Sequence, residues 1–311
     1  MIQYFNIVDH RTVATDKPGS GTWVNVLPPL KQEEFSELSE ALEIPLDFLK
    51  DSLDIDERSR YEAEDDVKLI VIKTPTENNS FNESDAFYIT IPICILLTKE
   101  QIVTVNSFEN EAIKKFLNSF QNRHPDKQNM MVLKIFEKII NTYQNHLKEI
   151  NLRRNALEQK LYAANRNEEL FQLMRIQKSL VYFVTALRSN ELLLMKLART
   201  DFLQLSDDEK DFLDDLVVET SQALETANTY TTILISTLDT FASIISNNQN
   251  VVLKRLTTIT LFLSIPVLIA SIYGMNVPLP FQQSPYAFWV PISISLVILA
   301  IVAFKFIKRK K

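Results

Sequence analysis

Four consecutive residues near the C-terminal end of the chain, Tyr273-Gly274-Met275-Asn276, combine types that suit contact with a hydrated cation. A carboxamide oxygen is a neutral acceptor, and small dications such as Mg²⁺ give up their water reluctantly. An asparagine at a narrow mouth therefore suits a hydrated dication better than a carboxylate, which would strip its water. One asparagine is too little for this chemistry, whereas a symmetric ring of asparagines would suffice. The alternative for the four residues is an ordinary helix end before a hairpin.

Hydroxyl side chains lie on one face of the segment that leads to this run. The face follows steps of three and four residues, which is the spacing of a helix. Such a mildly polar stripe could line a narrow pore, although small hydroxyl residues also let membrane helices pack closely. The stripe alone favours close packing, and the asparagine at its end favours the pore. It consists of Asn250, Leu253, Thr257, Thr260, Ser264, Val267 and Ser271.

Two uncharged segments near the C-terminus are long enough to cross a membrane. Residues 256–273 and 287–304 each run for 18 residues without a charged side chain, which is close to the length of a membrane-spanning helix. The sequence therefore predicts a first transmembrane pore helix at 251–276, an external loop at 277–286 and a second transmembrane helix at 287–307.

The charges that flank these spans predict their orientation. Lys254 and Arg255 precede the first span, a basic tail at 308–311 follows the second, and the loop between them has no lysine or arginine. The positive-inside rule places both termini in the cytoplasm and the loop outside, in a multi-pass protein of the cell membrane. Aromatic residues near the loop suit the outer interface of the lipid. They are Phe281, Tyr286, Phe288 and Trp289.

Proline and glycine divide the rest of the chain into two parts. Residues 1–125 hold seven of the twelve prolines and two of the three glycines, and their apolar runs predict an α/β domain. We expect strands at 67–72, 87–97 and 101–105, and helices at 33–42 and 45–52, the second opened by Pro45 in its first turn.

Residues 126–265 contain no proline or glycine, which predicts long helices. The segment 126–250 is expected to be a helical stalk, with a turn between helices at 165–168. A capping box at Ser206 and Glu209 should start a helix that runs to Tyr273, roughly 100 Å at about 1.5 Å per residue. Its apolar or threonine positions predict a heptad-like seam. They are Leu216, Thr220, Leu224, Ala227, Thr231, Leu234, Leu238, Phe241 and Ile245.

Charge and composition limit the classes of function. Seven of the 33 lysines and arginines lie in 251–311 and none of the 39 acidic residues does, which leaves a balance of −13 in 1–250. This surface argues against nucleic acid as a partner, and it either maintains solubility or attracts divalent cations. The three histidines are scattered and Cys94 is the only cysteine, so we expect no enzyme active site. Cys94 lies in an apolar run and is expected in the core.

The chain resembles the CorA family of magnesium and cobalt channels. The likeness is strongest from Leu253 to Asn276, where a capped helix and a polar-striped span lead to Gly-Met-Asn, and it extends loosely to 42–47 and 61–72. It implies a homopentamer in membrane lipid that takes up Mg²⁺, with Co²⁺ or Ni²⁺ as further candidates, down the membrane potential. Tyr273, Gly274, Met275 and Asn276 would form the selectivity filter, with Gly274 permitting the turn and with Tyr273 and Met275 packing against it.

The resemblance also implies which residues line the pore. Alignment without gaps from the motif selects Asn250, Leu253, Leu256 and Ser264, of which the two leucines would form a hydrophobic constriction. The helical stripe favours Thr257 over Leu256, and the choice stays open. Pro266 is displaced by one position from the usual proline of the family, so the register beyond Ser264 is open as well.

Regulation in the family uses Mg²⁺ held by acidic residues between neighbouring cytoplasmic domains. The resemblance selects Asp215, with Asp214 beside it, and Asp239 further along the same helix. The partner should lie in the loop 77–85, where Glu77 fits best and Glu83 and Asp85 are alternatives. Each of these carboxylates could instead be solvated. Five copies at −13 sum to −65, so loss of bridging cations should drive the domains apart and widen the pore.

One feature departs from the family, and it leaves ion choice open. The loop 277–286 has no acidic residue, whereas CorA loops commonly carry one soon after the motif. A transporter of zinc or another dication on the same scaffold is therefore an alternative, although zinc-handling relatives tend to vary the middle residue of the tripeptide. A non-conducting, membrane-anchored coiled-coil scaffold is a second alternative, but it would leave the asparagine and the hydroxyl stripe unexplained.

Overall fold

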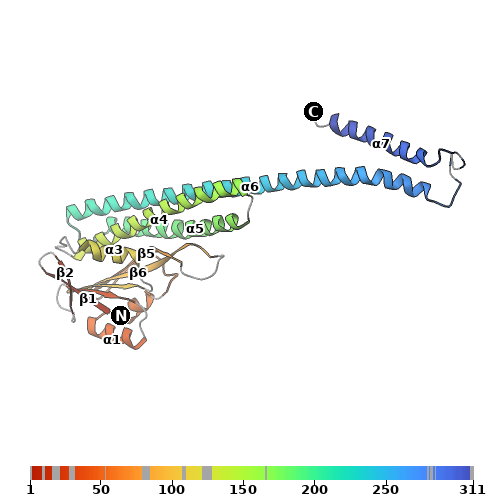
Figure 1. The fold of residues 1–311 in the computed structure, drawn as a ribbon. Helices are drawn as coiled ribbons and strands as arrows, with labels where there is room; N and C mark the ends of the chain where they lie inside the picture. The colour runs from red at the N-terminus through yellow and green to blue at the C-terminus, as the bar shows by residue number, and fades with distance from the viewer. Residues whose placement is uncertain are drawn as a thin grey trace. The chain divides into compact units, whose positions relative to one another are not determined.

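The computed structural model describes residues 2–8, 11–15, 22–27, 32–52, 54–78, 85–106, 110–120, 128–164, 167–278, 280, 283 and 285–308. These residues form two compact units, Met1–Leu238 and Asp239–Lys311. Helix α6, Asp207–Tyr273, contributes residues to both units (Figure 1). The predicted segment boundaries at 125, 250, 276, 286 and 307 are not decided by this division and stay predictions.

The first unit is built on one mixed, seven-stranded sheet. The strand order is β2-β1-β3-β7-β6-β5-β4, and every neighbouring pair is antiparallel except β3 and β7, which are parallel. The longest pairing joins β5 to β6, from Lys68 opposite Leu97 to Glu77 opposite Tyr88. The strands are β1 Ile2–Val8, β2 Arg11–Thr15, β3 Trp23–Val26, β4 Arg60–Glu64, β5 Val67–Glu77, β6 Tyr88–Leu97 and β7 Ile102–Asn106.

The three predicted strands correspond to β5, β6 and β7, and the other four were missed. Strand β4 is an edge strand with the sequence RYEAE, in which no side chain is buried, so no apolar alternation marks it. Strand β3 has only four residues, all buried, and is too short for periodicity to identify. The α/β class of this part is nevertheless as predicted.

Helices α1, Gln32–Leu42, and α2, Leu46–Asp51, cover one face of the sheet. Pro45 was expected in the first turn of α2. It is instead the N-cap residue, one position before that turn. The side chain of Cys94 is fully buried on this face, as predicted, and burial raises the pKa of its thiol. The buried cluster joins Phe35, Leu38, Leu42, Phe48 and Leu49 of the helices to Val24, Val26, Leu69, Val71, Cys94, Leu96, Val103 and Val105 of the strands.

Helices α3, Glu111–Phe120, α4, Gln128–Ala164, and α5, Asn167–Arg199, lie over the opposite face (Figure 1). Trp23 points to this side, where its ring meets Phe116 of α3 edge-on at 5.1 Å and its Nε1 donates to Thr104 Oγ1. Buried Asn190 ties α5 to β5, because its Nδ2 donates to the carbonyl of Lys73 and its Oδ1 accepts the Lys73 N–H. Helix α3 was not predicted. Helix α4 ends at Ala164 and α5 begins at Asn167, so two residues of the predicted turn, 165 and 166, lie outside the described residues and the other two belong to α5.

Helix α6 begins and ends where the sequence predicts. Its first residue follows Ser206, whose backbone N–H donates to the Glu209 carboxylate at 2.8 Å. The serine hydroxyl donates to the same carboxylate and not to the helix, so only one half of the capping box forms. Most of the predicted seam is buried, including Leu216, Thr220, Leu224, Ala227 and Leu234.

The first half of α6 lies along α4, and the two helices run in the same direction. Lys134 Nζ lies 4.3 Å from the ring centre of Phe212, and further along both helices Thr237 Oγ1 donates to Glu158 Oε1. The part of α6 that belongs to the first unit therefore packs along α4.

The second unit contains the remainder of α6 and helix α7, Trp289–Lys308. Helix α6 has an 18-residue window with a mean hydropathy of 2.0, none of it buried, and is the one described helix long and apolar enough to cross a membrane. The apolar part of α7 that is described, Trp289–Phe304, is shorter. Tyr286, Phe288 and Trp289 are exposed, as an interfacial belt requires, and Phe281 lies outside the described residues.

A buried histidine joins three elements of the first unit. His146 of α4 is 4 % exposed, with Nδ1 3.1 Å from Glu149 and Nε2 3.2 Å from Glu111 of α3. The Tyr88 hydroxyl of β6 donates to Glu149 at 2.8 Å. Burial opposes ionisation of Glu149, but hydrogen bonds with His146 and Tyr88 outweigh it and lower the pKa of this carboxyl below its ordinary 4.5.

Glu149→Gln should therefore reduce stability most above pH 4.5. A lowered pKa in the folded state contributes stability above the ordinary pKa, and this contribution disappears as pH falls through the folded value. We expect the difference in unfolding free energy between wild type and Glu149→Gln to shrink in that acid range, measured by urea unfolding of the full chain in detergent. Glu168→Gln, at an exposed position on α5, is the control, and a pH-independent difference for Glu149→Gln would contradict the assignment.

Candidate functional site

The candidate filter residues form the turn that ends α6. Gly274 N–H donates to Ala270 O at 2.9 Å, which completes the last α-helical hydrogen bond, and Met275 N–H donates to Ile272 O at 3.3 Å. Asn276 follows with its side chain exposed. The C-terminal end of a helix carries partial negative charge from unpaired carbonyls, which favours cations. The carboxamide therefore lies at an end that is attractive to cations without any carboxylate.

The expected role of Gly274 is wrong for the single chain. The φ of Gly274 lies outside the left-handed region, and an added Cβ would meet Ala270 O at 3.4 Å and Ser271 O at 3.6 Å, which is ordinary contact. The turn therefore does not require glycine. Met275 is 56 % exposed in the single chain, whereas Tyr273 is half-buried.

The hydroxyl groups of the stripe are oriented by the helix itself. Three of the four hydroxyl groups of the stripe donate to the carbonyl four residues earlier: Thr257 to Leu253 at 2.8 Å, Thr260 to Leu256 at 2.9 Å and Ser264 to Thr260 at 2.8 Å. The hydroxyl hydrogen is thereby used within the helix, so the oxygen presents its lone pairs outward. The waters of a hydrated cation point their hydrogens away from the ion, and outward lone pairs are suitable acceptors for them.

The other pore-lining candidates are also exposed in the single chain. Asn250 is exposed, and Leu253 and Leu256 are 57 % and 58 % exposed. Because both Leu256 and Thr257 are exposed, the choice between them stays open. Pro266 lies within α6, where it leaves the carbonyl of Phe262 without its usual N–H donor.

An apolar groove of about 670 Å³ runs between the end of α6 and the start of α7 in the second unit. Tyr273 and Gly274 line it from α6, and Phe288 and Pro291 line it from the α7 side. The two spans therefore leave room beside the filter turn for lipid or for a neighbouring helix.

The regulatory candidates that the structure describes do not form a metal site within one chain. Asp214, Asp215 and Asp239 on α6 and Glu77 at the end of β5 are all exposed. Among the described residues, no group of three histidine, cysteine or acidic side chains is placed to hold a metal. Asp85 is half-buried, and Glu83 lies outside the described residues. Glu219, whose pKa is raised by burial and then by Glu137 and Asp215, lies in acidic surroundings.

The structure places two arginines near the regulatory candidate Glu77, and they were not identified from the sequence. Arg153 of α4 and Arg175 of α5 place their guanidinium carbons 4.1 Å and 4.0 Å from the ring centre of Phe87. Arg175 Nε also donates to the carbonyl of Asp85 at 2.7 Å. These side chains lie at the same end of the β5–β6 pair as Glu77, because Asn78 N–H donates to Phe87 O. The three residues are far apart in the sequence, so no motif connects them.

Residues 19–309 match the family of CorA-like Mg²⁺ transporter proteins. This chain belongs to that family. The match includes strands β3 to β7, the helices of the first unit, the turn at Asn276 and α7. Membership in a transporter family also agrees with the expectation that the chain is not an enzyme.

Individual relatives agree with the family match. The chain is 27 % identical over 290 residues to the cobalt/magnesium transport protein CorA of Methanocaldococcus jannaschii, covering 91 % of this chain and 89 % of that protein. The protein of the same name from Thermotoga maritima is 23 % identical over 298 residues, covering 93 % and 83 %. The complete structure of the M. jannaschii CorA magnesium transporter aligns with a TM-score of 0.84 at 25 % identity, over 98 % of this chain and 97 % of that one. The predicted CorA-like fold is thus confirmed.

Gly274→Ala should fold as well as the wild type. Since a Cβ at this position makes only ordinary contacts, we expect an unchanged helical signal and an unfolding temperature within about 2 °C in detergent, measured by circular dichroism. If the variant loses transport while it keeps this stability, the glycine is needed by a neighbouring copy and not by the turn. A large loss of helix would contradict the geometry.

Proposed function

We propose that five copies of this chain form a channel that carries Mg²⁺, and also Co²⁺, across the cell membrane into the cytoplasm. The observation that carries the proposal is Asn276, an exposed carboxamide on the turn that ends the uncharged segment of α6. The relatives named as cobalt/magnesium transport proteins support the choice of ions. Ni²⁺ is a further candidate, and a zinc transporter on the same scaffold is the alternative.

Asn276 acts as the outer filter in this proposal. Five carboxamide oxygens around one axis would accept hydrogen bonds from the water shell of a dication and need not remove it. The negative end of each α6 dipole adds to this attraction. These neutral groups compensate for a loop, 277–286, that has no acidic residue, and they favour a hydrated dication over a dehydrated one.

The hydroxyl stripe continues the same chemistry below the filter. Thr257, Thr260 and Ser264 face the water column with oxygens whose hydrogens are already donated to the helix. A ring of such oxygens accepts hydrogen bonds from cation-bound water and offers no donor to an anion. Leu253, with Leu256 as the alternative neighbour to Thr257, would form the hydrophobic constriction that closes the pore by dewetting.

The membrane potential drives the ion, and cytoplasmic Mg²⁺ closes the pore. A divalent ion gains roughly 4.6 kcal/mol on crossing 100 mV toward the negative side. With both termini in the cytoplasm, the acidic part of the chain faces the ion that has entered. In the proposal, Asp215 and Asp214 of one copy share Mg²⁺ with Glu77 of the next, and Asp239 holds a further ion on the stalk.

Asn276→Ala should abolish ion uptake. The variant keeps the backbone turn but removes the only side-chain carbonyl from the filter. We expect it to fail to restore growth of a magnesium-auxotrophic strain and to show no uptake of Mg²⁺, Co²⁺ or Zn²⁺ into proteoliposomes. Gln283→Ala, which removes an exposed carboxamide from the same loop, is the matched control. Uptake by Asn276→Ala equal to that of the wild type would exclude this residue from the filter.

Thr260→Val should reduce Mg²⁺ flux at least several-fold. Valine has nearly the same shape as threonine, so the change removes an acceptor oxygen from the stripe and leaves the helix intact. Thr258→Val is the control, because Thr258 makes the same hydrogen bond, to Lys254 O at 2.7 Å, but lies off the stripe. Equal flux through both variants would mean that the stripe does not line the pore.

A further inference from the structure

Two guanidinium groups from different helices are held against a single ring at the end of the β5–β6 pair. Arg153 and Arg175 both lie about 4 Å from the centre of Phe87, and no ion pair joins either of them to a described residue. Stacking on an aromatic ring fixes the plane of a guanidinium and leaves its edge available for a carboxylate. The arrangement is a receptor for acidic groups, formed before any partner arrives.

The side chains beside this receptor are of the kind found in protein interfaces. Phe171 and Met174 precede Arg175 by four residues and by one, and they are 62 % and 48 % exposed. Exposed aromatic residues, methionine and arginine together are enriched in protein interfaces. The receptor therefore suits a protein partner better than a small ion.

The start of α6 carries the complementary charge. Five of the nine residues 207–215 are aspartates, and all five are exposed. Lys210 is the only basic residue in this segment. Lys210 lies 3.9 Å from Asp207, and the other four form no ion pair with the described residues. They are Asp208, Asp211, Asp214 and Asp215.

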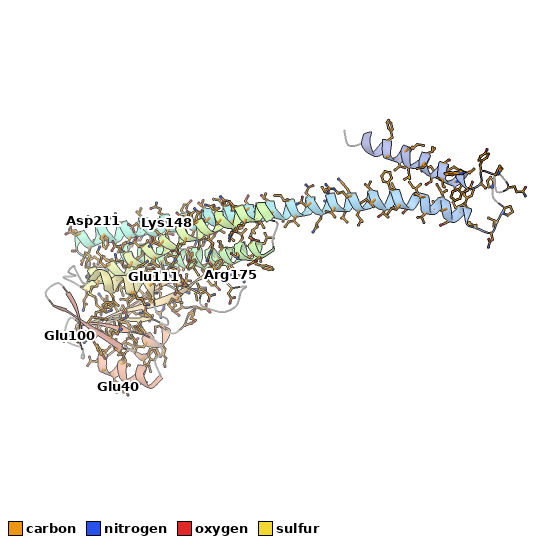
Figure 2. The ribbon with its side chains drawn as sticks, in the orientation of Figure 1. Glu40, Glu100, Glu111, Lys148, Arg175 and Asp211 are labelled. Atoms are coloured by element: carbon orange, nitrogen blue, oxygen red, sulfur yellow. The ribbon has the colours of Figure 1, made fainter. Side chains whose placement is uncertain are left out.

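The receptor and these aspartates cannot meet within one chain. The contact between Lys134 and Phe212 places the start of α6 beside the first part of α4. Asp215 lies about one turn further on, so some 16 residues of α4, roughly 24 Å, separate its level from that of Arg153. Figure 2 shows Asp211 and Arg175 well apart along the bundle, so the carboxylates must come from another molecule.

We propose that Arg153, Phe87 and Arg175 receive the aspartates at the start of α6 from a second copy of this chain. The inference rests on the proposed homo-oligomer. It also concerns the proposed regulation by Mg²⁺, because Glu77 lies at the same end of the β5–β6 pair as the two arginines. Two fixed positive charges beside Glu77 attract the neighbouring carboxylates in the absence of Mg²⁺. The contact between copies thus persists at low Mg²⁺, and bound Mg²⁺ reinforces it.

Reciprocal charge reversal tests this contact in the full-length protein in detergent, with EDTA present so that no dication can bridge carboxylates. Arg153→Glu with Arg175→Glu should raise the concentration at which the oligomer dissociates about tenfold or more, measured by light scattering. Asp214→Arg with Asp215→Arg should do the same. The variant with all four changes should regain the stability of the wild-type oligomer. Arg188→Glu with Lys196→Glu, also exposed on α5, is the charge-matched control and should change nothing.

The outcomes separate this inference from the proposed function. The receptor would be overturned if the variant with all four changes did not regain the stability of the oligomer, or if the control weakened the oligomer equally. Uptake of Mg²⁺ by the wild type would still leave the channel proposal intact. A wild type that is monomeric and takes up no ion would overturn both. If the pair is correct, Arg153→Gln with Arg175→Gln should also make the oligomer depend on added Mg²⁺.

Discussion

A helix in hydrocarbon must satisfy its own backbone hydrogen bonds, and this requirement governs the functional end of the chain. Along the uncharged segment of α6, even the hydroxyl side chains donate to carbonyls of the helix. Apart from the Phe262 carbonyl, which Pro266 leaves without a donor, the chain first leaves this closed pattern at the turn after Tyr273, where carbonyls and the Asn276 carboxamide become available together. The same rule that hides polar groups along the span therefore concentrates them at its end.

The first unit meets a different requirement, which is to hold many carboxylates on a stable frame. Its sheet is covered on both faces and fastened to α5 by Asn190 and to α4 by the Tyr88–Glu149–His146 cluster. These buried polar groups are partnered inside the unit, so the remaining acidic side chains are free to face outward. The frame thus carries many carboxylates at its surface, although Glu169 is buried and one of its carboxylate oxygens has no hydrogen-bond partner among the described residues.

The long helices and the apolar spans could be predicted because their sequence patterns extend over many residues. Short strands, and contacts between residues far apart in the sequence, could not be predicted. Residues 126–265 lack proline and glycine, so the limits of α6 followed from Ser206 at one end and Gly274 at the other. Strand β4 was missed because an exposed edge strand has no apolar side to reveal it. The reason for Gly274 was wrong because φ is a property of the folded turn and cannot be read from residue type. The Arg153–Phe87–Arg175 contact joins three distant positions, and only the packing of α4 and α5 on β6 brings them together.

Pro266 gives α6 a mechanical property that its neighbours lack. Because this residue has no N–H, the Phe262 carbonyl one turn earlier has no backbone bond to lose when the helix axis changes direction. A change of bend is less costly here than elsewhere along the rod, and the position is about two turns below Tyr273. A small hinge movement at this level would be magnified into a lateral swing of the carboxamide at the tip.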